Sequence, residues 1–358
     1  MSAAIVGLGT WLPEHARGND AWPATFAARE HTGGDRTFND IPLAEDPQAA
    51  AIVARDLALE AQDPFLGATL RRVADDAISA ADAESSAAQA ALADAGLSGA
   101  DVDVLMSNSI VPDRLMPSTA AAVADRIGAS RALALGIDAA CASGVAQLDV
   151  ARAYVESGMA KVVLLTQSHL LLRVFPLLHP ACPGLGDGAS AMVVARGRGL
   201  ALRATYAITH GEHARAVTFV RGQDDASDPP WWKAGGDFRL GSRAPELAKL
   251  LMRDTVSFGA ATIREVAERA GADVERIAAL ASVQPRGFLP GAIAERLGLA
   301  RERAITTYGE IAHVGACGPA FNLERARKLG LLARGALIAM YAQGSGFTRS
   351  AALLEVTN

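Results

Sequence analysis

Short runs of apolar residues recur along this chain, separated by polar segments rich in Gly, Asp and Pro. Runs that are apolar on both faces are typical of strands in a sheet covered by helices. The predicted strands are residues 3–7, 102–107, 133–138, 162–166, 191–195 and 351–356. Helical segments lie between them, and strand–helix–strand units imply parallel pairing. The pattern therefore predicts an α/β fold.

Spacings of three and four between apolar residues mark the helices. The stretch after Cys141 is the clearest, because one apolar stripe runs to Val155 and stops at Gly158. Other helices are expected near residues 48–60, 67–83, 85–95, 117–127 and 256–270. Ser85 or Ser86 can cap the start of the third of these, since serine is favoured at that position.

The second part of the chain repeats the order of the first. Each copy has a helix ending before a glycine, a strand, a helix that follows a proline, and a small-residue segment. The repeated segments are residues 85–107 with 256–282, and residues 116–128 with 289–298. We therefore expect two duplicated halves, residues 1–197 and 198–358. Cys141 and His313 are expected at pseudo-equivalent ends, facing each other across a two-fold axis.

Composition narrows the class of protein. The 358 residues are 50% hydrophobic and 20% charged, with a net charge of -5, which is ordinary for a globular protein and gives no sign of a nucleic-acid partner. Three scattered cysteines are too few for a disulfide framework or a zinc site, so we expect a reducing cytoplasm and no metal or cofactor. The N-terminus lacks signal-peptide features, and no apolar run is long enough to span a membrane.

Cys141 lies between a predicted strand and a predicted helix, in the sequence Asp138-Ala-Ala-Cys-Ala-Ser-Gly144. A cysteine at a helix N-terminus meets the positive end of the helix dipole and unpaired backbone N–H groups. Both favour the thiolate, which is the nucleophilic form. The segment is therefore a candidate for holding an acyl group as a thioester. A buried structural cysteine is the other interpretation.

A thiolate nucleophile needs a base nearby, and the chain has seven histidines to supply one. His169 and His179 flank an apolar stretch, which is typical of core histidines. His210 and His213 belong to a polar turn. His313 lies in a segment rich in Gly and Ala after a strand, where close packing around a reacting group is possible. We therefore assign the base to His313.

Two further segments are candidates for binding. The turn at residues 344–347 can present an N–H group to an oxyanion, although an ordinary hairpin turn has the same sequence. Ser345 in that turn is a candidate substrate contact. Trp231 and Trp232 are adjacent in a polar loop, where they could form the wall of a substrate tunnel or anchor the loop in the core.

The order and spacing of these motifs resemble the ketoacyl-ACP synthase III group of the thiolase superfamily over nearly the whole chain. The matching segments are residues 7–14, 138–144, 186–189 and 344–347. The resemblance implies a thiolase-like five-layer αβαβα fold of two duplicated halves, and a homodimer. It also implies that Cys141 takes an acyl group from a thioester, and that the backbone N–H groups of Cys141 and Gly346 form the oxyanion hole.

The second half departs from the family pattern. Condensing members carry His-Gln-Ala-Asn where this chain reads Ser282-Val-Gln-Pro-Arg-Gly287, so that Gln284 lies at or near the place of a histidine. Their Gly-Asn pair is replaced by Ala312-His313. Decarboxylative condensation uses two groups to stabilise an enolate, and these residues are a poor substitute. A single histidine beside the cysteine suits deprotonation of an alcohol or amine. Gln284 is expected to orient the acyl carbonyl or His313.

The altered pattern is similar to synthase-III-like acyltransferases of antibiotic biosynthesis, such as the pactamycin type, which move 6-methylsalicylyl or orsellinyl-like groups. The similarity implies that an acyl carrier protein or another thioester donates an aromatic polyketide acyl group through Cys141. The acceptor would be a hydroxyl or amine of a small molecule, such as a sugar or cyclitol. Replacing His313 by Ala is expected to leave loading of Cys141 intact and to stop transfer. A decarboxylative 3-oxoacyl-ACP synthase III and a non-catalytic partner subunit are the alternatives.

Overall fold

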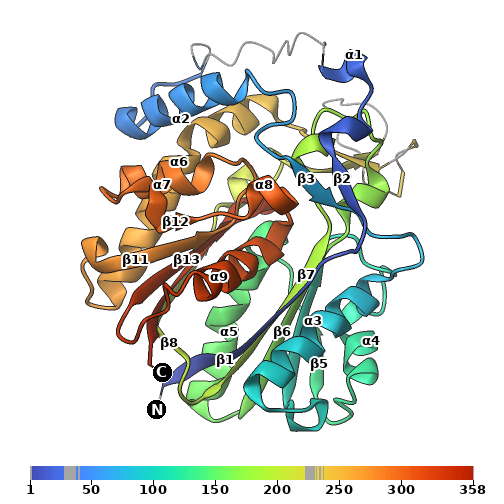
Figure 1. The fold of residues 1–358 in the computed structure, drawn as a ribbon, viewed down its shortest axis with the longest axis vertical. Helices are drawn as coiled ribbons and strands as arrows, with labels where there is room; N and C mark the ends of the chain where they lie inside the picture. The colour runs from blue at the N-terminus through green and yellow to red at the C-terminus, as the bar shows by residue number, and fades with distance from the viewer. Residues whose placement is uncertain are drawn as a thin grey trace.

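A ten-stranded mixed sheet forms the centre of the molecule (Figure 1). The computed structural model describes residues 2–27, 38, 41–221, 230, 232–233, 235–236 and 238–357. The strand order across the sheet is β12-β11-β13-β14-β8-β1-β7-β6-β4-β5. The α/β class predicted from the apolar runs is therefore confirmed.

Each half of the chain supplies one half of this sheet. The first half contributes β1 (Ala3–Trp11), β4 (Val104–Ser109), β5 (Leu133–Gly136), β6 (Val162–His169) and β7 (Gly188–Arg196). The second half contributes β8 (Leu200–Thr209), β11 (Ile277–Ser282), β12 (Ala304–Ile305), β13 (Leu337–Gln343) and β14 (Thr348–Val356). The two halves meet where β1 pairs with β8 through Ala4–Ala201 and Ile5–Leu200. The predicted boundary between residues 197 and 198 stays a prediction, and it falls in the turn between β7 and β8.

Helices form three layers around the two halves of the sheet. α5 (Ser143–Ser157) and α9 (Gly318–Lys328) lie between them, and their apolar residues share one core with strands of both halves. α3 (Ala80–Ala95) and α4 (Thr119–Arg126) pack on the outer face of the first half. α2 (Pro47–Glu60), α6 (Pro245–Arg269) and α7 (Leu289–Arg296) pack on the outer face of the second half. This is the thiolase-like five-layer arrangement that the resemblance implied.

The structure confirms the internal repeat. The order α3–β4–α4–β5–α5 in the first half returns as α6–β11–α7–β12–α9 in the second, with the short helix α8 (Tyr308–Ile311) added before α9. The turns repeat as well. Gly96 and Gly271 have φ values of 68° and 62°, and both follow the first helix of their copy. A positive φ is accessible to glycine at little cost, so the same residue closes the same turn twice.

Two predictions near the start of the chain were wrong. α3 begins at Ala80 and not near Ser85, because Ser79 and Asp82 form a capping box that starts the helix one turn earlier than expected. The helix predicted over residues 67–83 is absent over most of its length. Those residues include β3 (Leu70–Arg72), which pairs with β2 (Ala16–Gly18).

Glycines let the first strand run longer than its apolar pattern indicated. β1 continues to Trp11, which pairs with Ala189 of β7. A Cβ atom at Gly9 would lie 2.2 Å from the carbonyl oxygen of Ala87 in α3. The strand therefore extends beyond the predicted end at Gly7, and the helix backbone packs directly against it.

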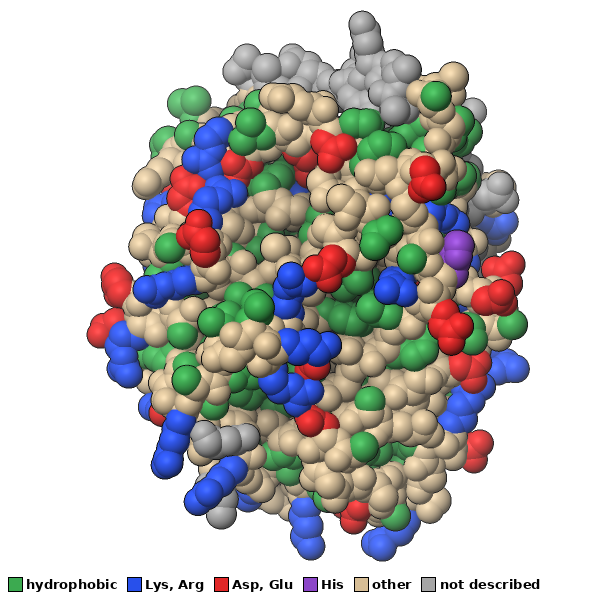
Figure 2. Space-filling view, in the orientation of Figure 1, with side chains coloured by type: hydrophobic (Ala, Val, Ile, Leu, Met, Phe, Trp, Pro, Cys, Tyr) green, Lys and Arg blue, Asp and Glu red, His purple; other side chains and the backbone are tan. Residues whose placement is uncertain are grey.

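Smaller elements complete the described chain. They are α1 (Ala24–Ala27) and the pair β9 (Thr218–Arg221) and β10 (Phe238–Gly241). Within the described ranges, none of the helices has the length and apolar character needed to cross a membrane. Figure 2 shows basic and acidic side chains interspersed over one face of the molecule, in keeping with the small net charge of -5.

Candidate active site

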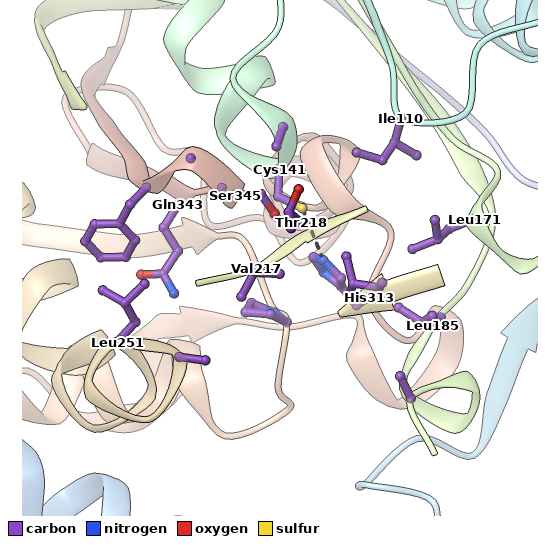
Figure 3. A pocket seen from close by; sticks show the side chains of 18 of the residues that line it. Ile110, Cys141, Leu171, Leu185, Val217, Thr218, Leu251, His313, Gln343 and Ser345 are labelled. Atoms are coloured by element: carbon purple, nitrogen blue, oxygen red, sulfur yellow. Dashed lines mark hydrogen bonds between the residues drawn. The ribbon is translucent and has the colours of Figure 1, made fainter. Parts of the chain in front are cut away.

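A cavity of about 1140 Å³ lies where the two halves meet. Cys141, His313 and His169 line it together with the turn at residues 344–347. Figure 3 shows Cys141 and His313 facing each other there. β5 leads to Cys141 and β6 ends at His169, so the first half delivers both residues from the carboxyl ends of strands that each pair in parallel with β4. Such edges are where open α/β sheets bind ligands.

Cys141 is held on a strained backbone turn at the start of α5. The preceding residue, Ala140, has φ 49°, which is unusual for a residue other than glycine. Side chains stabilise this turn, because Asp138 Oδ1 accepts a hydrogen bond from the Ala140 N–H at 2.8 Å and Ser143 Oγ accepts one from the Ala139 N–H at 2.8 Å. The turn directs the Cys141 side chain into the cavity.

His313 lies opposite Cys141, with its Nε2 3.6 Å from Sγ. Its backbone is tied to the first half, since its N–H donates to Gly184 O at 3.0 Å and its carbonyl accepts from the Gly186 N–H at 3.0 Å. The preceding residue, Ala312, has φ 56°, so a second strained backbone position orients the His313 side chain. The structure thus brings together the two residues that sequence reasoning paired.

The two residues are not at pseudo-equivalent positions, however. Cys141 follows Ala140 directly, and the corresponding positive-φ residue of the second half is Gly315, with φ 55°. Short 3-10 helices, Ala140–Ala142 and Gly315–Cys317, begin at these residues. By this match Ala316 corresponds to Cys141, and His313 corresponds to Asp138.

Burial keeps the Cys141–His313 pair neutral. It raises the pKa of the Cys141 thiol to about 11, and the negative charge of Asp138 adds to the rise. Burial lowers the pKa of His313 to about 3, and His169 adds to the fall. The dipole of α5 favours the thiolate, as expected from the sequence, but a helix terminus contributes at most about 2 kcal/mol, less than the opposing effect of burial. The resting site therefore holds a thiol beside a neutral imidazole, and His313 must accept the thiol proton as sulfur attacks.

The glycine turn packs directly on the cysteine backbone. A Cβ atom at Gly344 would lie 2.3 Å from Ala139 O and 2.9 Å from Cys141 N, so only glycine fits there. Gly346 has φ 77°. Among the described residues, neither the Cys141 N–H nor the Gly346 N–H donates a hydrogen bond to another residue. Both groups remain available to an oxyanion, and the predicted oxyanion hole stays a prediction with this support.

Gln284 is buried behind the site and not in the cavity wall. Its Nε2 donates to Thr307 Oγ1 at 2.9 Å and to Ala312 O at 3.2 Å. Its Oε1 accepts from Asn322 Nδ2 at 3.1 Å and from Thr306 Oγ1 at 3.0 Å. Of the two expected roles, contact with the acyl carbonyl is excluded in this arrangement. Gln284 instead holds the strained Ala312 that precedes His313.

The remaining predicted contacts divide three ways. Ser345 lines the cavity close to Cys141 (Figure 3). Trp232 is 66% exposed and is not part of the described cavity wall, so its predicted substrate contact stays a prediction without support from the described residues. Trp231 lies outside the described residues.

Sequence reasoning missed His169, which was treated as a core histidine. Its ring lies 5.4 Å from the His313 ring, centroid to centroid, and its Nδ1 is 2.8 Å from Gly186 O. A carbonyl oxygen only accepts, so Nδ1 carries the hydrogen and Nε2 of the neutral ring carries a lone pair. The position of His169 at the end of a parallel strand was the signal that could have found it.

Two family models match this chain, and each contains one residue of the central pair. The model described as 3-Oxoacyl-[acyl-carrier-protein (ACP)] synthase III matches residues 135–211. The model of the C-terminal part of that family matches residues 267–356. Cys141 belongs to the first matched segment and His313 to the second.

Individual proteins are similar over longer stretches. A beta-ketoacyl-[acyl-carrier-protein] synthase III of Nitratidesulfovibrio vulgaris is 30% identical over 281 residues, which is 77% of this chain and 83% of that protein. The protein of that name from Bordetella petrii is 25% identical over 357 residues, 99% of this chain and 98% of its own.

Solved structures agree in fold. The 3-oxoacyl-[acyl-carrier-protein] synthase III of Aquifex aeolicus superposes with a TM-score of 0.76 at 26% identity, covering 99% of this chain and 100% of that one. Xanthomonas campestris OleA has a TM-score of 0.76 at 20% identity over 99% of this chain and 98% of its own, which concerns the fold alone. From its matches and its thiolase-like architecture, the chain belongs to the 3-oxoacyl-[acyl-carrier-protein] synthase III family.

Proposed function

We propose that this protein is an acyltransferase that carries its acyl group on Cys141 and passes it to a hydroxyl or amine. In the first step the donor carbonyl lies against the N–H groups of Cys141 and Gly346. His313 Nε2 accepts the thiol proton as Sγ attacks the carbonyl carbon. The donor C–S bond then breaks, and the donor thiol leaves with the proton from His313.

The second step returns the enzyme to its resting state. The acceptor O–H or N–H attacks the acyl carbonyl, and His313 accepts its proton. The bond between the acyl carbon and Cys141 Sγ breaks, and the sulfur recovers the proton from His313. An ester or amide is released, with no net change in the protein.

The observation that carries this proposal is the kind of nitrogen that faces the cavity. Enolate stabilisation in decarboxylative condensation needs hydrogen-bond donors, whereas His169 presents a lone pair at Nε2. The Gln284 side chain cannot supply one either, because its Nε2 already donates to Thr307 and Ala312 and its Oε1 accepts from Asn322. Two hydrogen-bond acceptors beside an acyl-cysteine, one of which also accepts the proton, suit a nucleophile that carries a hydrogen.

The substrates belong to the same proposal. The relatives are named for an acyl carrier protein, and we propose such a carrier, or another thioester, as the donor. The resemblance to antibiotic-pathway acyltransferases suggests an aromatic polyketide acyl group and a sugar or cyclitol acceptor. We also propose a homodimer, from the resemblance to the synthase III group, and a cytoplasmic setting, from the few scattered cysteines.

The second candidate is a decarboxylative 3-oxoacyl-[acyl-carrier-protein] synthase III that starts acyl chains. The similar proteins are named beta-ketoacyl-[acyl-carrier-protein] synthase III, which favours this candidate over transfer to oxygen or nitrogen. The replacement of the family's paired histidine and asparagine by Gln284 and His313 favours the first candidate.

Intact-protein mass spectrometry tests the shared step. Acetyl, butyryl and benzoyl thioesters of N-acetylcysteamine are incubated with the protein, and a mass increase that maps to Cys141 is expected from at least one. If no donor acylates the protein, acyl carrier protein thioesters included, the alternative of a non-catalytic partner subunit is favoured. Release of CO₂ from malonyl thioester, coupled to a 3-oxoacyl product, would assign the second candidate.

A further inference from the structure

We propose that His169 is a second hydrogen-bond acceptor for the incoming nucleophile, so that the acceptor molecule carries a second O–H or N–H beside its attacking group. This inference rests on the proposed function and names the class of acceptor: a vicinal diol or an amino alcohol. His313 accepts the proton of the attacking atom, and His169 Nε2 binds the neighbouring donor. His169 keeps its protonation state throughout, and the bonds that form and break are those of the transfer step.

The ring of His169 is fixed in one orientation. Nδ1 donates to Gly186 O at 2.8 Å, and the side chain is only 2% exposed. Gly315 packs against the opposite edge of the ring, and a Cβ atom there would lie 2.3 Å from Cδ2. With φ 55°, this glycine leaves room for an imidazole that any other residue would displace. A fixed ring presents Nε2 in one direction.

That direction is toward the cavity. His169 is part of the cavity lining, and among the described residues its Nε2 has no hydrogen-bond partner. Buried polar atoms without partners include His313 Nδ1 but not His169 Nε2. The lone pair of His169 is therefore accessible to a molecule in the cavity, whereas a satisfied core histidine has both nitrogen atoms bonded.

The two histidines lie close enough to serve one small molecule. Their ring centroids are 5.4 Å apart at an interplanar angle of 63°, and His313 Nε2 already contacts Cys141 Sγ. Adjacent hydroxyls can therefore reach His313 and His169 together. A methyl ether in place of the second hydroxyl keeps the oxygen but offers no hydrogen, and a lone pair on Nε2 cannot bind it.

Three small alcohols test this in the wild-type protein. Cys141 is loaded from the N-acetylcysteamine thioester that acylates it, and ester formation is followed with ethylene glycol, 2-methoxyethanol or ethanol. Rates are expressed per acylated Cys141 and corrected for the two equivalent hydroxyls of the glycol. We expect the glycol to exceed the other two by about 3- to 10-fold in kcat/KM, the effect of one hydrogen bond. Equal rates for the glycol and 2-methoxyethanol would overturn the proposal.

Two variants assign the preference to His169. In H169N the amide nitrogen takes the place of Nδ1 and can still donate to Gly186 O, but the acceptor in the cavity is lost. In H169Q an amide oxygen lies near the place of Nε2. The glycol preference should vanish in H169N and return in part in H169Q.

Other outcomes overturn the proposal. A preference that persists in H169N shows that another group binds the second hydroxyl. An equal slowing of all three alcohols shows that His169 acts by positioning His313. If esters form but selectivity is absent, the proposed function stands and only this inference fails. If Cys141 cannot be acylated, both fail.

Discussion

The two halves of the molecule contain the same backbone turn but carry different side chains at equivalent positions in it. In the first half Ala140, with φ 49°, starts a short 3-10 helix that leads into α5, and the cysteine follows it. In the second half Gly315, with φ 55°, starts the corresponding turn before α9, and Ala316 follows it. The residue three positions before the cysteine is Asp138, and its counterpart is His313.

The two halves therefore share one scaffold and differ in the residues that form the site. The first half contributes the nucleophile and the second contributes its base, so neither end is complete alone. Backbone hydrogen bonds of His313 to Gly184 and Gly186 join the two ends.

The largest effect is expected at the nucleophile. C141A should abolish acyl loading, because no other described thiol faces the cavity. The control is C317A, which gives the second-half turn the alanine that the first half has at Ala142. Loading of C317A at Cys141, read from the mass shift, should persist. Acylation of C141A at the wild-type extent would place the nucleophile elsewhere.

The H313A variant removes the base that the second half contributes to the site. The thiol pKa of about 11 leaves little thiolate at pH 7.5, so we expect loading to slow by about 10²- to 10⁴-fold, in addition to the loss of transfer. The sequence alone suggested that loading would survive. The rate in H313A should rise about tenfold per pH unit toward pH 11 as the thiolate forms. Rapid-quench loading rates measure this, and a normal rate at pH 7.5 would show that His313 is not the base.

Substitution of Gln284 tests how the second half holds His313 in position. Q284A removes the hydrogen bond to Ala312 O and leaves Thr307 and Asn322 short of partners. We expect the free energy of unfolding to fall by about 1–3 kcal/mol and loading to slow by about tenfold. Gln62 is an exposed glutamine, and Q62A should change stability by less than about 0.5 kcal/mol. Urea unfolding and loading rates separate the two variants, and equal behaviour would remove Gln284 from the site.

The smallest effect concerns pH and stability. His313 has its pKa lowered to about 3 in the folded protein, so between pH 7.5 and 5.5 the unfolded chain binds a proton that the folded chain does not. The free energy of unfolding therefore decreases as the pH is lowered from 7.5 to 5.5, by about 1 kcal/mol for this group. Asp187, whose burial raises its pKa to about 6, acts in the opposite direction in every variant.

Comparison with H313A isolates the contribution of the histidine. The loss of stability between pH 7.5 and 5.5 should be smaller in H313A by about 1 kcal/mol, measured by urea unfolding at both values. An identical loss in both proteins would mean that His313 titrates normally in the fold.

Most of the strands and helices could be predicted from the sequence alone. Apolar runs marked the covered strands, and Gly96 and Gly271 marked repeated turns, because both signals are local. The capping box at Ser79 and the pairing of β2 with β3 were missed. The first lies outside the apolar pattern, and the second depends on contacts between residues 16–18 and 70–72.

The site was less completely predictable. Cys141 and His313 could be paired from their motifs, and the structure puts their side chains 3.6 Å apart, although the repeat had placed them at equivalent positions that they do not occupy. The orientation of Gln284 and the exposure of Trp232 depend on packing that no local pattern encodes. His169 was overlooked because its apolar neighbours are typical of a core residue, whereas its role depends on one nitrogen atom facing the cavity.

A single-turnover partition of the acyl-enzyme separates transfer to oxygen from carbon–carbon bond formation. Protein loaded at Cys141 is mixed with equal concentrations of malonyl thioester and ethylene glycol, and CO₂, ester and 3-oxoacyl product are quantified together. Transfer to oxygen predicts that the ester accounts for the acyl group lost from Cys141, with no CO₂ above the malonyl blank. Stoichiometric CO₂ with a 3-oxoacyl product would contradict it and assign carbon–carbon bond formation to this site.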